Sequence, residues 1–598
     1  MFLGQARNHI LYLAIYFLAG FGCFLTYVLF IRVLRIQYIY HYIPQIANPV
    51  LFTPTADIVI WALIFVIVCF ADLLTLRRMS GSWTYWKSIV FVLTGILIIA
   101  FPFLVVSLTP WLVLFYSVPF FYLIYSPLKG LSRRFVFYLS AFAAFGTFLV
   151  IELVSAEILF SQMLGFDTLS LDIERQVLET TIDLTYTFQH YSVQLLLVLA
   201  FSWTAFPLLL LPRMKTCSPA TPNQVSRVAR IVLLSSVLLS ALAIGIRYIG
   251  DAGIYGVDTR YYLNILMATG DVETLFKLLP SDPRVTYILL LKFLTNLGAS
   301  PELAINIGPV ILMILNSCAS YMLGNEIARN NFAGALVGMF SALGMQTSTS
   351  LYAGIYANWL GMFLAVCAFA FYLRAVRTEK PLLFTLPGLL AVSALFVHPW
   401  SGLVFSLVLI FASLLDAVFL RQRRMRFVLA ITLFACAITL ILTVAYLFTP
   451  YRGTLAQLQP VYAALQIQNA QKLTSNLAFT MDYMVGGFTS APIIYFTGLV
   501  GCIFLYKSWR LLLGSKLLFA WLVITSIPLL FAEQWIQWRL IYLMPIQVLS
   551  GLGVYYVSFF LISAKTRAST GLEFTLVCTV LVALVNYLLS SVKFIPGL

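Results

Sequence analysis

Charged side chains are scarce in this 598-residue chain, where Asp, Glu, Lys and Arg together make up only 10% of the residues. They nevertheless gather in one stretch, between Arg247 and Gly298. Eight of them lie there close together: Asp251, Asp258, Arg260, Asp271, Glu273, Lys277, Asp282 and Arg284. A carboxylate can accept a proton and a guanidinium group can bind an anion. We therefore expect the chemistry of this protein in this stretch, where Tyr261 and Tyr262 also follow Asp258 closely.

Two apolar segments flank these charges and must position them. The first, Ile231 to Ile249, is long enough to cross a bilayer and delivers the chain to the polar stretch. The second, Val285 to Leu297, is bounded by Pro283 and Gly298 and is shorter than the roughly 20 residues that a spanning helix needs. We interpret it as a helix lying in the membrane interface. The charged stretch is thus predicted to be a membrane-attached polar loop.

The composition predicts an all-α polytopic membrane protein. Hydrophobic residues make up 62% of the chain, in long continuous runs rather than in the alternating pattern of a β-barrel. From run length and flanking charge we count about 17 transmembrane helices. Residues 1–211 are predicted to be an N-terminal module of six spans, 212–230 a cytoplasmic linker rich in Pro, Ser and Thr, and 231–598 a membrane core of about 11 spans.

The net charge of +15 is explained by topology rather than by a nucleic-acid partner. Most of the 36 basic residues fall in loops on one side of the predicted membrane, and most of the 21 acidic residues fall on the other. This positive-inside pattern places the N-terminus in the cytoplasm. We predict a multi-pass protein of the plasma membrane, with the polar loop on the extracytoplasmic face. The eight cysteines and four histidines show no spacing typical of a zinc site.

On this topology four further outer segments converge on the polar loop. They are Gln346 to Trp359, His398 to Gly402, Thr449 to Ser490, and Glu533 to Pro545.

The pattern of an outward span, an acidic outer loop, an interfacial helix and about ten more spans resembles the GT-C superfamily. These are integral-membrane glycosyltransferases that use lipid-linked sugars, and they include mannosyltransferases and aminoarabinose transferases. The segment Gly256 to Tyr262 is similar to the acidic motif of their first outer loop, and Pro283 to Leu291 is similar to the helix that follows it. Arg539, in the sequence WRLIYLMP, looks like their late outer-face arginine.

This resemblance implies a GT-C-like core and transfer of a sugar from a polyprenyl-phosphate donor to the hydroxyl of a glycan, lipid or protein acceptor. A carboxylate would take the proton of the acceptor hydroxyl, and a cation would hold the phosphate leaving group. Asp258 is the first expected base and Asp251 its competitor, while Arg539 and then Arg260 are the expected phosphate ligands. The other expected substrate contacts are Tyr262, His398, Trp400 and Trp538. The lipid-linked sugar is a co-substrate, and no separate cofactor or metal is implied.

Each assignment has an alternative. Asp258 can be a solvated loop acid or a helix N-cap, Arg539 can extend to the lipid headgroups, and His398 can hydrogen-bond locally at a helix end. Asp416, near a span end, is expected to be exposed at the interface. The segment Gln346 to Trp359 holds no second acidic motif, which argues against an oligosaccharyltransferase and an obligatory metal. The main functional alternative is a membrane transporter or lipid flippase.

Overall fold

The computed structural model describes residues 226–250, 254–278, 284–378, 380–419, 492–508, 513–526, 534–562 and 567–593. The six predicted N-terminal spans, Asp251, and the segment Thr449 to Ser490 lie outside these residues. The chain divides into two compact units, and the larger one contains Thr216–Met484, Ile494–Tyr556 and Tyr587–Leu598. Residues 226–419, with the gaps given above, lie entirely within this larger unit.

The described residues form helices and no strand. The first part of the larger unit consists of α7 (Ser226–Gly245), the π-helical turn η2 (Ile246–Gly250), α8 (Thr259–Ala268), α9 (Val272–Leu278) and α10 (Val285–Asn296). A run of longer helices follows: α11 (Pro301–Ala328), α12 (Asn331–Leu343), α13 (Met345–Ala353), α14 (Tyr356–Thr378), α15 (Pro381–Val397) and α16 (Pro399–Phe419). The last described helices are α20 (Pro492–Ser508), α21 (Leu513–Ser526), α22 (Gln534–Leu543), α23 (Ile546–Ile562) and α24 (Arg567–Lys593).

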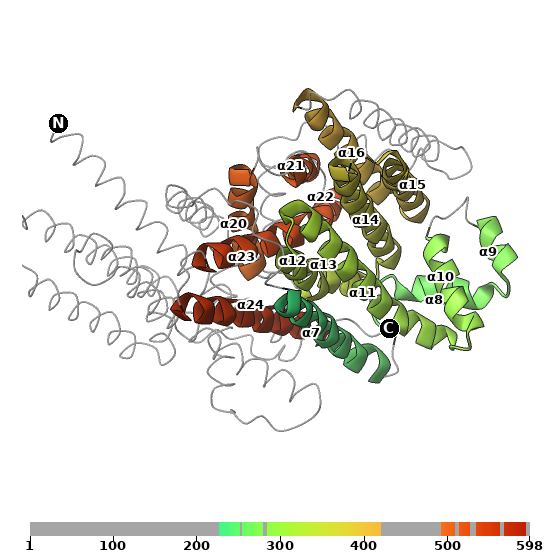
Figure 1. The fold of residues 1–598 in the computed structure, drawn as a ribbon. Coiled ribbons are helices and arrows are strands. Elements are labelled where there is room, and N and C mark those ends of the chain that lie inside the picture. The colour runs from blue at the N-terminus through green and yellow to red at the C-terminus, as the bar shows by residue number, and fades with distance from the viewer. Residues whose placement is uncertain are drawn as a thin grey trace, which may run out of the picture. The chain divides into compact units, whose positions relative to one another are not determined.

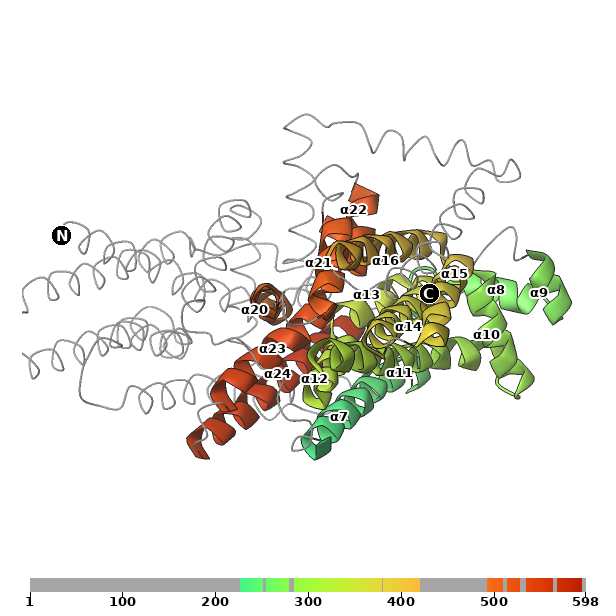
Figure 2. The same ribbon diagram turned by 45° about the horizontal axis from the view of Figure 1, so that its top comes forward.

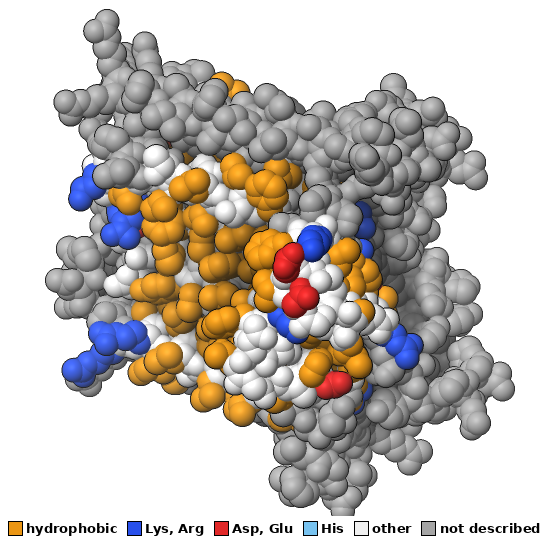
Figure 3. All heavy atoms as spheres, turned by 90° about the vertical axis from the view of Figure 1, so that its right-hand side faces the viewer, with side chains coloured by type: hydrophobic (Ala, Val, Ile, Leu, Met, Phe, Trp, Pro, Cys, Tyr) orange, Lys and Arg blue, Asp and Glu red, His pale blue; other side chains and the backbone are white. Residues whose placement is uncertain are grey.

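Among these helices, four are long and apolar enough to cross a membrane by length and composition: Arg227–Tyr248, Pro301–Ala328, Tyr356–Thr378 and Pro399–Asp416. This finding agrees with the predicted class, an all-helical membrane protein. Leucines and isoleucines at three- and four-residue spacing are exposed along α7, for example Ile231, Leu234, Leu238 and Leu242, as expected of a helix that meets an apolar environment. Figure 3 shows one face of the molecule on which hydrophobic side chains cover a broad area and the acidic side chains gather in one part.

Local capping determines where α11 begins and where it gives way to α12. The side chain of Ser300 accepts a hydrogen bond from the N–H of Leu303 at 3.1 Å, and Pro301 takes the first position of α11. Arg329 ends the helix in the left-handed conformation. The carboxamide oxygen of Asn330 then accepts hydrogen bonds from two amides in the first turn of α12, those of Phe332 and Ala333. These caps allow two long helices to reverse direction within two residues.

Small residues let α11 and α12 pack closely, side by side in Figures 1 and 2. A Cβ atom at Gly324 of α11 would lie 2.8 Å from Val337 of α12, and one at Gly334 would lie 2.7 Å from the carbonyl oxygen of Tyr321. Close backbone approach of this kind is the usual source of stability between membrane helices, where lipid offers no hydrophobic driving force. α7 packs on α12, and α14 packs on both α11 and α15.

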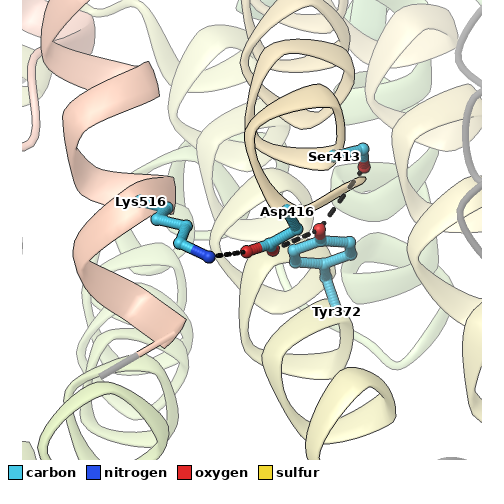
Figure 4. Close-up of polar contacts among 4 residues, drawn as sticks. All are labelled: Tyr372, Ser413, Asp416 and Lys516. Atoms are coloured by element: carbon cyan, nitrogen blue, oxygen red, sulfur yellow. Dashed lines mark hydrogen bonds and ion pairs between the residues drawn. The ribbon is translucent and has the colours of Figure 1, made fainter. Parts of the chain in front are cut away.

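The structure corrects the expectation for Asp416, which is buried rather than interface-exposed, with 1% of its surface accessible. Its carboxylate accepts a hydrogen bond from the hydroxyl of Tyr372 at 2.8 Å and pairs with the ammonium group of Lys516 at 3.1 Å (Figure 4). The three side chains come from α16, α14 and α21. The physical reason is compensation, because a carboxylate among packed helices needs both a counter-charge and hydrogen bonds.

The structure also corrects the expectation for the start of the outer segment Gln346 to Trp359. α12 ends at Leu343, Gly344 has an extended backbone (φ −94°, ψ −168°), and α13 begins immediately after it. Residues 346–350, expected to lie in an outer loop, are fully part of α13 and are all buried.

Candidate functional site

The Asp258 loop, which we define as residues 254–258, is held against the end of α13 by two backbone hydrogen bonds. The N–H of Val257 donates to the carbonyl of Tyr352 at 3.1 Å, and the N–H of Asp258 donates to that of Ala353 at 3.0 Å. The last carbonyls of a helix have no partner inside it, so the loop satisfies two of them. The backbone position of Asp258 is therefore determined by α13.

Two glycines make this close approach possible. Gly256 has φ +98° and Gly354 has φ +67°, and both values lie in the region that favours glycine. A Cβ atom on Gly256 would be 2.7 Å from the carbonyl oxygen of Leu351, and one on Gly354 would be 2.9 Å from the amide nitrogen of Asp258. Neither position accommodates a larger residue without moving the loop.

Asp258 occupies the N-cap position of α8, but its side chain makes no capping hydrogen bond. The carboxylate is half-buried, and this burial raises its pKa above the ordinary value of an aspartate, while the nearby Arg284 and Arg539 act in the opposite direction. Burial lowers the pKa of Arg539, and Asp258 counteracts that shift. One carboxylate and two guanidinium groups from three different elements thus lie close enough to influence one another electrostatically.

The two arginines come from opposite ends of the larger unit's sequence. Arg284 immediately precedes α10, and its guanidinium carbon lies 3.8 Å from the centroid of the Tyr261 ring, a cation–π contact that holds the side chain over α8. Arg539 lies in α22 and is half-buried. Sequence reasoning did not select Arg284 as a site residue, although its place directly after Pro283, at the start of a predicted helix, was visible. Arg260, the expected second ligand, is exposed on α8.

A layer of tyrosines lies beneath the Asp258 loop. Tyr262, with 1% of its surface accessible, packs edge-on against Tyr287 at 5.1 Å between ring centroids and stacks with Tyr356 at 5.9 Å. Its hydroxyl accepts a hydrogen bond from the N–H of Ala357 at 3.4 Å. The ring faces are therefore occupied by protein in this structure, and a role for Tyr262 in stacking on a sugar stays a prediction.

Thr259 connects this layer to the loop. Its hydroxyl donates to the carbonyl of Tyr255 at 2.6 Å and contacts the hydroxyl of Tyr356 at 3.3 Å. The hydroxyl of Tyr248, in the π-helical turn η2 that follows α7, donates to the carbonyl of Leu351 at 3.1 Å. The residue after Asp258 is thus anchored in a buried polar and aromatic network, which gives the candidate site a rigid floor.

His398 lies at the break between α15 and α16, and Trp400 is half-buried as the second residue of α16. The Nδ1 atom of His398 is 3.0 Å from the hydroxyl of Ser401, and that hydroxyl also contacts the side chain of Asn358. The local hydrogen bond anticipated as the alternative role of His398 is therefore present. Since the hydroxyl of Thr286 donates to the carbonyl of Phe396 at 2.9 Å, this helix end also lies next to the start of α10.

Two expected residues are not placed. Asp251 lies outside the described residues, and of Trp538 only the backbone, within α22, is described. In the described part of the chain, no cluster of three or more His, Cys, Asp and Glu side chains offers a metal site.

No protein-family model matches this chain, and no curated protein matches it either. The assignment of a function therefore depends on the chemistry of the residues around Asp258.

Proposed function

We propose that this protein is an inverting glycosyltransferase of the GT-C type, which moves a sugar from a polyprenyl-phosphate donor to an acceptor hydroxyl on the extracytoplasmic face of the plasma membrane. The observation that carries the proposal is the electrostatic interaction of Asp258 with Arg284 and Arg539, in a chain that contains four helices long and apolar enough to cross a membrane. A base beside two fixed cations suits a reaction in which a proton is removed while a phosphate leaves.

In the proposed reaction the oxygen of the acceptor hydroxyl bonds to the anomeric carbon as the bond from that carbon to the phosphate oxygen breaks. The hydroxyl proton passes to the carboxylate of Asp258, and the electron pair of the broken bond stays on the polyprenyl phosphate. A single displacement of this kind inverts the configuration of the anomeric carbon. The raised pKa of Asp258 favours this role because a more basic carboxylate accepts a proton more readily.

Arg539 and Arg284 would bind the phosphate of the donor and offset the charge that develops as it leaves. Two guanidinium groups and one carboxylate together carry a net positive charge. A phosphate that enters the site would neutralise this charge. The acceptor, whether glycan, lipid or protein, would approach from the side of the Asp258 carboxylate. The polyprenyl tail would remain in the membrane lipid.

The test is a transfer assay with the full-length protein in proteoliposomes and a panel of radiolabelled polyprenyl-phosphate sugars. Asp258→Asn should abolish transfer, whereas the matched variant Glu273→Gln, at an exposed acid on α9, should leave it intact. Asp251→Asn tests the competing base. Full transfer by both Asp258→Asn and Asp251→Asn would refute the assignment of the base.

The buried pair of Asp416 and Lys516 favours a second candidate, a transporter or lipid flippase, because ionisable residues inside membrane bundles often mark transport pathways. A fluorescent polyprenyl phosphate in proteoliposomes, with its headgroup exposed to a quencher added outside, measures lipid movement between leaflets. Movement that Asp416→Asn abolishes and Asp258→Asn leaves unchanged would favour this candidate over the glycosyltransferase.

A further inference from the structure

The helix α13 contacts both charged elements of the candidate site. Its C-terminal carbonyls accept the amides of Val257 and Asp258, as described above. It also packs against α22, the helix that carries Arg539, through Gln346 and Ser350. All residues from Met345 to Leu351 are buried, so α13 is an internal element rather than a surface loop.

The contact with α22 uses carbonyls at the C-terminal end of that helix, where no further turn supplies N–H donors. α22 ends at Leu543, and α23 begins at Ile546. The side-chain amide of Gln346 donates to the carbonyls of Tyr542 at 2.9 Å and Met544 at 3.3 Å. The carbonyl between them, that of Leu543, accepts from the indole N–H of Trp521 at 2.7 Å. Three successive orphan carbonyls are thus satisfied from other helices.

A third contact joins the same two helices. The hydroxyl of Ser350 lies 2.7 Å from the hydroxyl of Tyr542, within hydrogen-bonding distance. Gln346 and Ser350 are four residues apart, so they share one face of α13 and hold the end of α22 at two points. Because unpaired carbonyls in a dry interior are costly, α22 has one favoured position against α13.

We infer that α13 is a rigid bridge that sets the separation between Asp258 and Arg539, and that Gln346 and Ser350 are positioning residues for Arg539. The helix has nine residues and is about 13 Å long. Its polar sequence, MQTSTSLYA, is explained by this role, because the side chains of Gln346, Ser348 and Ser350 bond to other segments. That the two bridged residues act on one substrate rests on the proposed function, but the bridge does not.

Cross-linking tests the bridge without any substrate. An Asp258→Cys/Arg539→Cys pair is introduced into the full-length protein after its eight native cysteines have been replaced, and its reaction with a short bifunctional thiol reagent is timed. Gln346→Leu should slow intramolecular cross-linking about five-fold or more, and the milder Ser350→Ala about two-fold, since each removes hydrogen bonds that hold α22.

Thr347→Val is the matched control. It removes a buried hydroxyl from the same helix, but that hydroxyl donates only to the nearby carbonyl of Ser341 at 2.7 Å. Gln346→Glu adds a second measurement, the pH dependence of the cross-linking rate, which a simple loss of packing would not change. The isosteric acid can donate to a carbonyl only when protonated, so its cross-linking rate relative to Thr347→Val should recover as the pH falls.

Equal rates in Gln346→Leu, Ser350→Ala and Thr347→Val would overturn the inference, whether or not the protein transfers sugars. Conversely, if the unaltered protein transfers no sugar while the cross-linking rates differ as expected, the proposed function fails and the bridge stands. With an active protein, Gln346→Leu should lower kcat more than it raises the KM for the donor, because the spacing of base and phosphate ligand matters most in the transition state.

Discussion

The substitution Gly354→Ala should release the Asp258 loop from α13. The alanine side chain would be strained at φ +67°, at a cost of about 1–2 kcal/mol for a left-handed conformation. Its Cβ atom would also lie 2.9 Å from the amide nitrogens of both Asp258 and Thr259. The loop must move to relieve this clash, and it then loses the two hydrogen bonds to Tyr352 and Ala353, each worth about 1 kcal/mol.

These contributions sum to about 3 kcal/mol, or roughly a 100-fold change in the equilibrium for opening the loop, since 1.4 kcal/mol corresponds to a factor of ten. Hydrogen–deuterium exchange measures this opening directly through the amides of Val257 and Asp258. In Gly354→Ala a peptide covering residues 254–262 should exchange about 100-fold faster at these amides than in the unaltered protein. Transfer activity should fall about 100-fold as well, because a displacement of about 1 Å in a catalytic group has that effect.

Gly270→Ala is the control for both measurements, because a Cβ atom there meets no other atom within 4 Å and Gly270 lies in the same group of outer elements. Unchanged exchange at residues 254–262 in Gly354→Ala would refute the claim that the end of α13 holds Asp258. Rapid exchange throughout the protein would instead show a general loss of structure.

Three further predictions follow from the charges. The acidic limb of the pH–rate profile should lie above the ordinary pKa of an aspartate, since burial raises the pKa of Asp258 and the base must be ionised. Arg284→Gln should move that limb to still higher pH, because Arg284 lowers this pKa; a limb that stays in place would contradict the contact. Arg539→Ala should raise the donor KM and lower kcat, with partial recovery in Arg539→Lys, whereas Arg260→Ala, at an exposed residue, should change both by less than about two-fold. Asp416→Asn should destabilise the protein by about 2–3 kcal/mol in thermal unfolding by leaving Lys516 without its counter-charge, and Asp416→Leu/Lys516→Met should recover most of that loss; an unstable double variant would contradict this reasoning.

The pH dependence of stability has the opposite sign from that of activity. The folded-state pKa of Asp258 is raised above its unfolded value, so its neutral form is favoured by folding. Its contribution to stability is therefore fully present below the unfolded pKa and is lost as the pH rises through the folded pKa. A site that operates with ionised Asp258 thus gives up some stability to hold a charged base.

The sequence predicted which segments form the candidate site, but it did not predict how their side chains are arranged. The all-helical membrane class and the helix at Val285 to Leu297 follow from run length and punctuation by Pro and Gly, and the structure contains both. The expectation that the segments with Gln346 and Arg539 lie near the Asp258 loop also matches the structure. The glycosyltransferase function was suggested by the resemblance of Gly256 to Tyr262 and of Pro283 to Leu291, and it stays a prediction.

What sequence reasoning missed depends on tertiary contacts. The break at Gly344 lies where the apolar run that begins at residue 332 gives way to polar residues, and a buried helix made of those polar residues was not expected. Polar residues 346–350 suggested an outer loop, but in the structure the side chains of Gln346, Thr347, Ser348 and Ser350 bond to carbonyls and hydroxyls inside the protein. Arg284 was not selected because its nearness to Asp258 arises only when α10 packs beside α8. Tyr262 illustrates the same limit, since an aromatic residue fits a sugar site and a protein core equally well.

The most direct test of the central claim is a cryo-EM map of the purified full-length protein with a polyprenyl-phosphate sugar added. We expect phosphate density beside Arg539 and Arg284, with the sugar within about 3–4 Å of the Asp258 carboxylate. A central cavity that opens to either side of the membrane, with no lipid phosphate at these arginines, would contradict it.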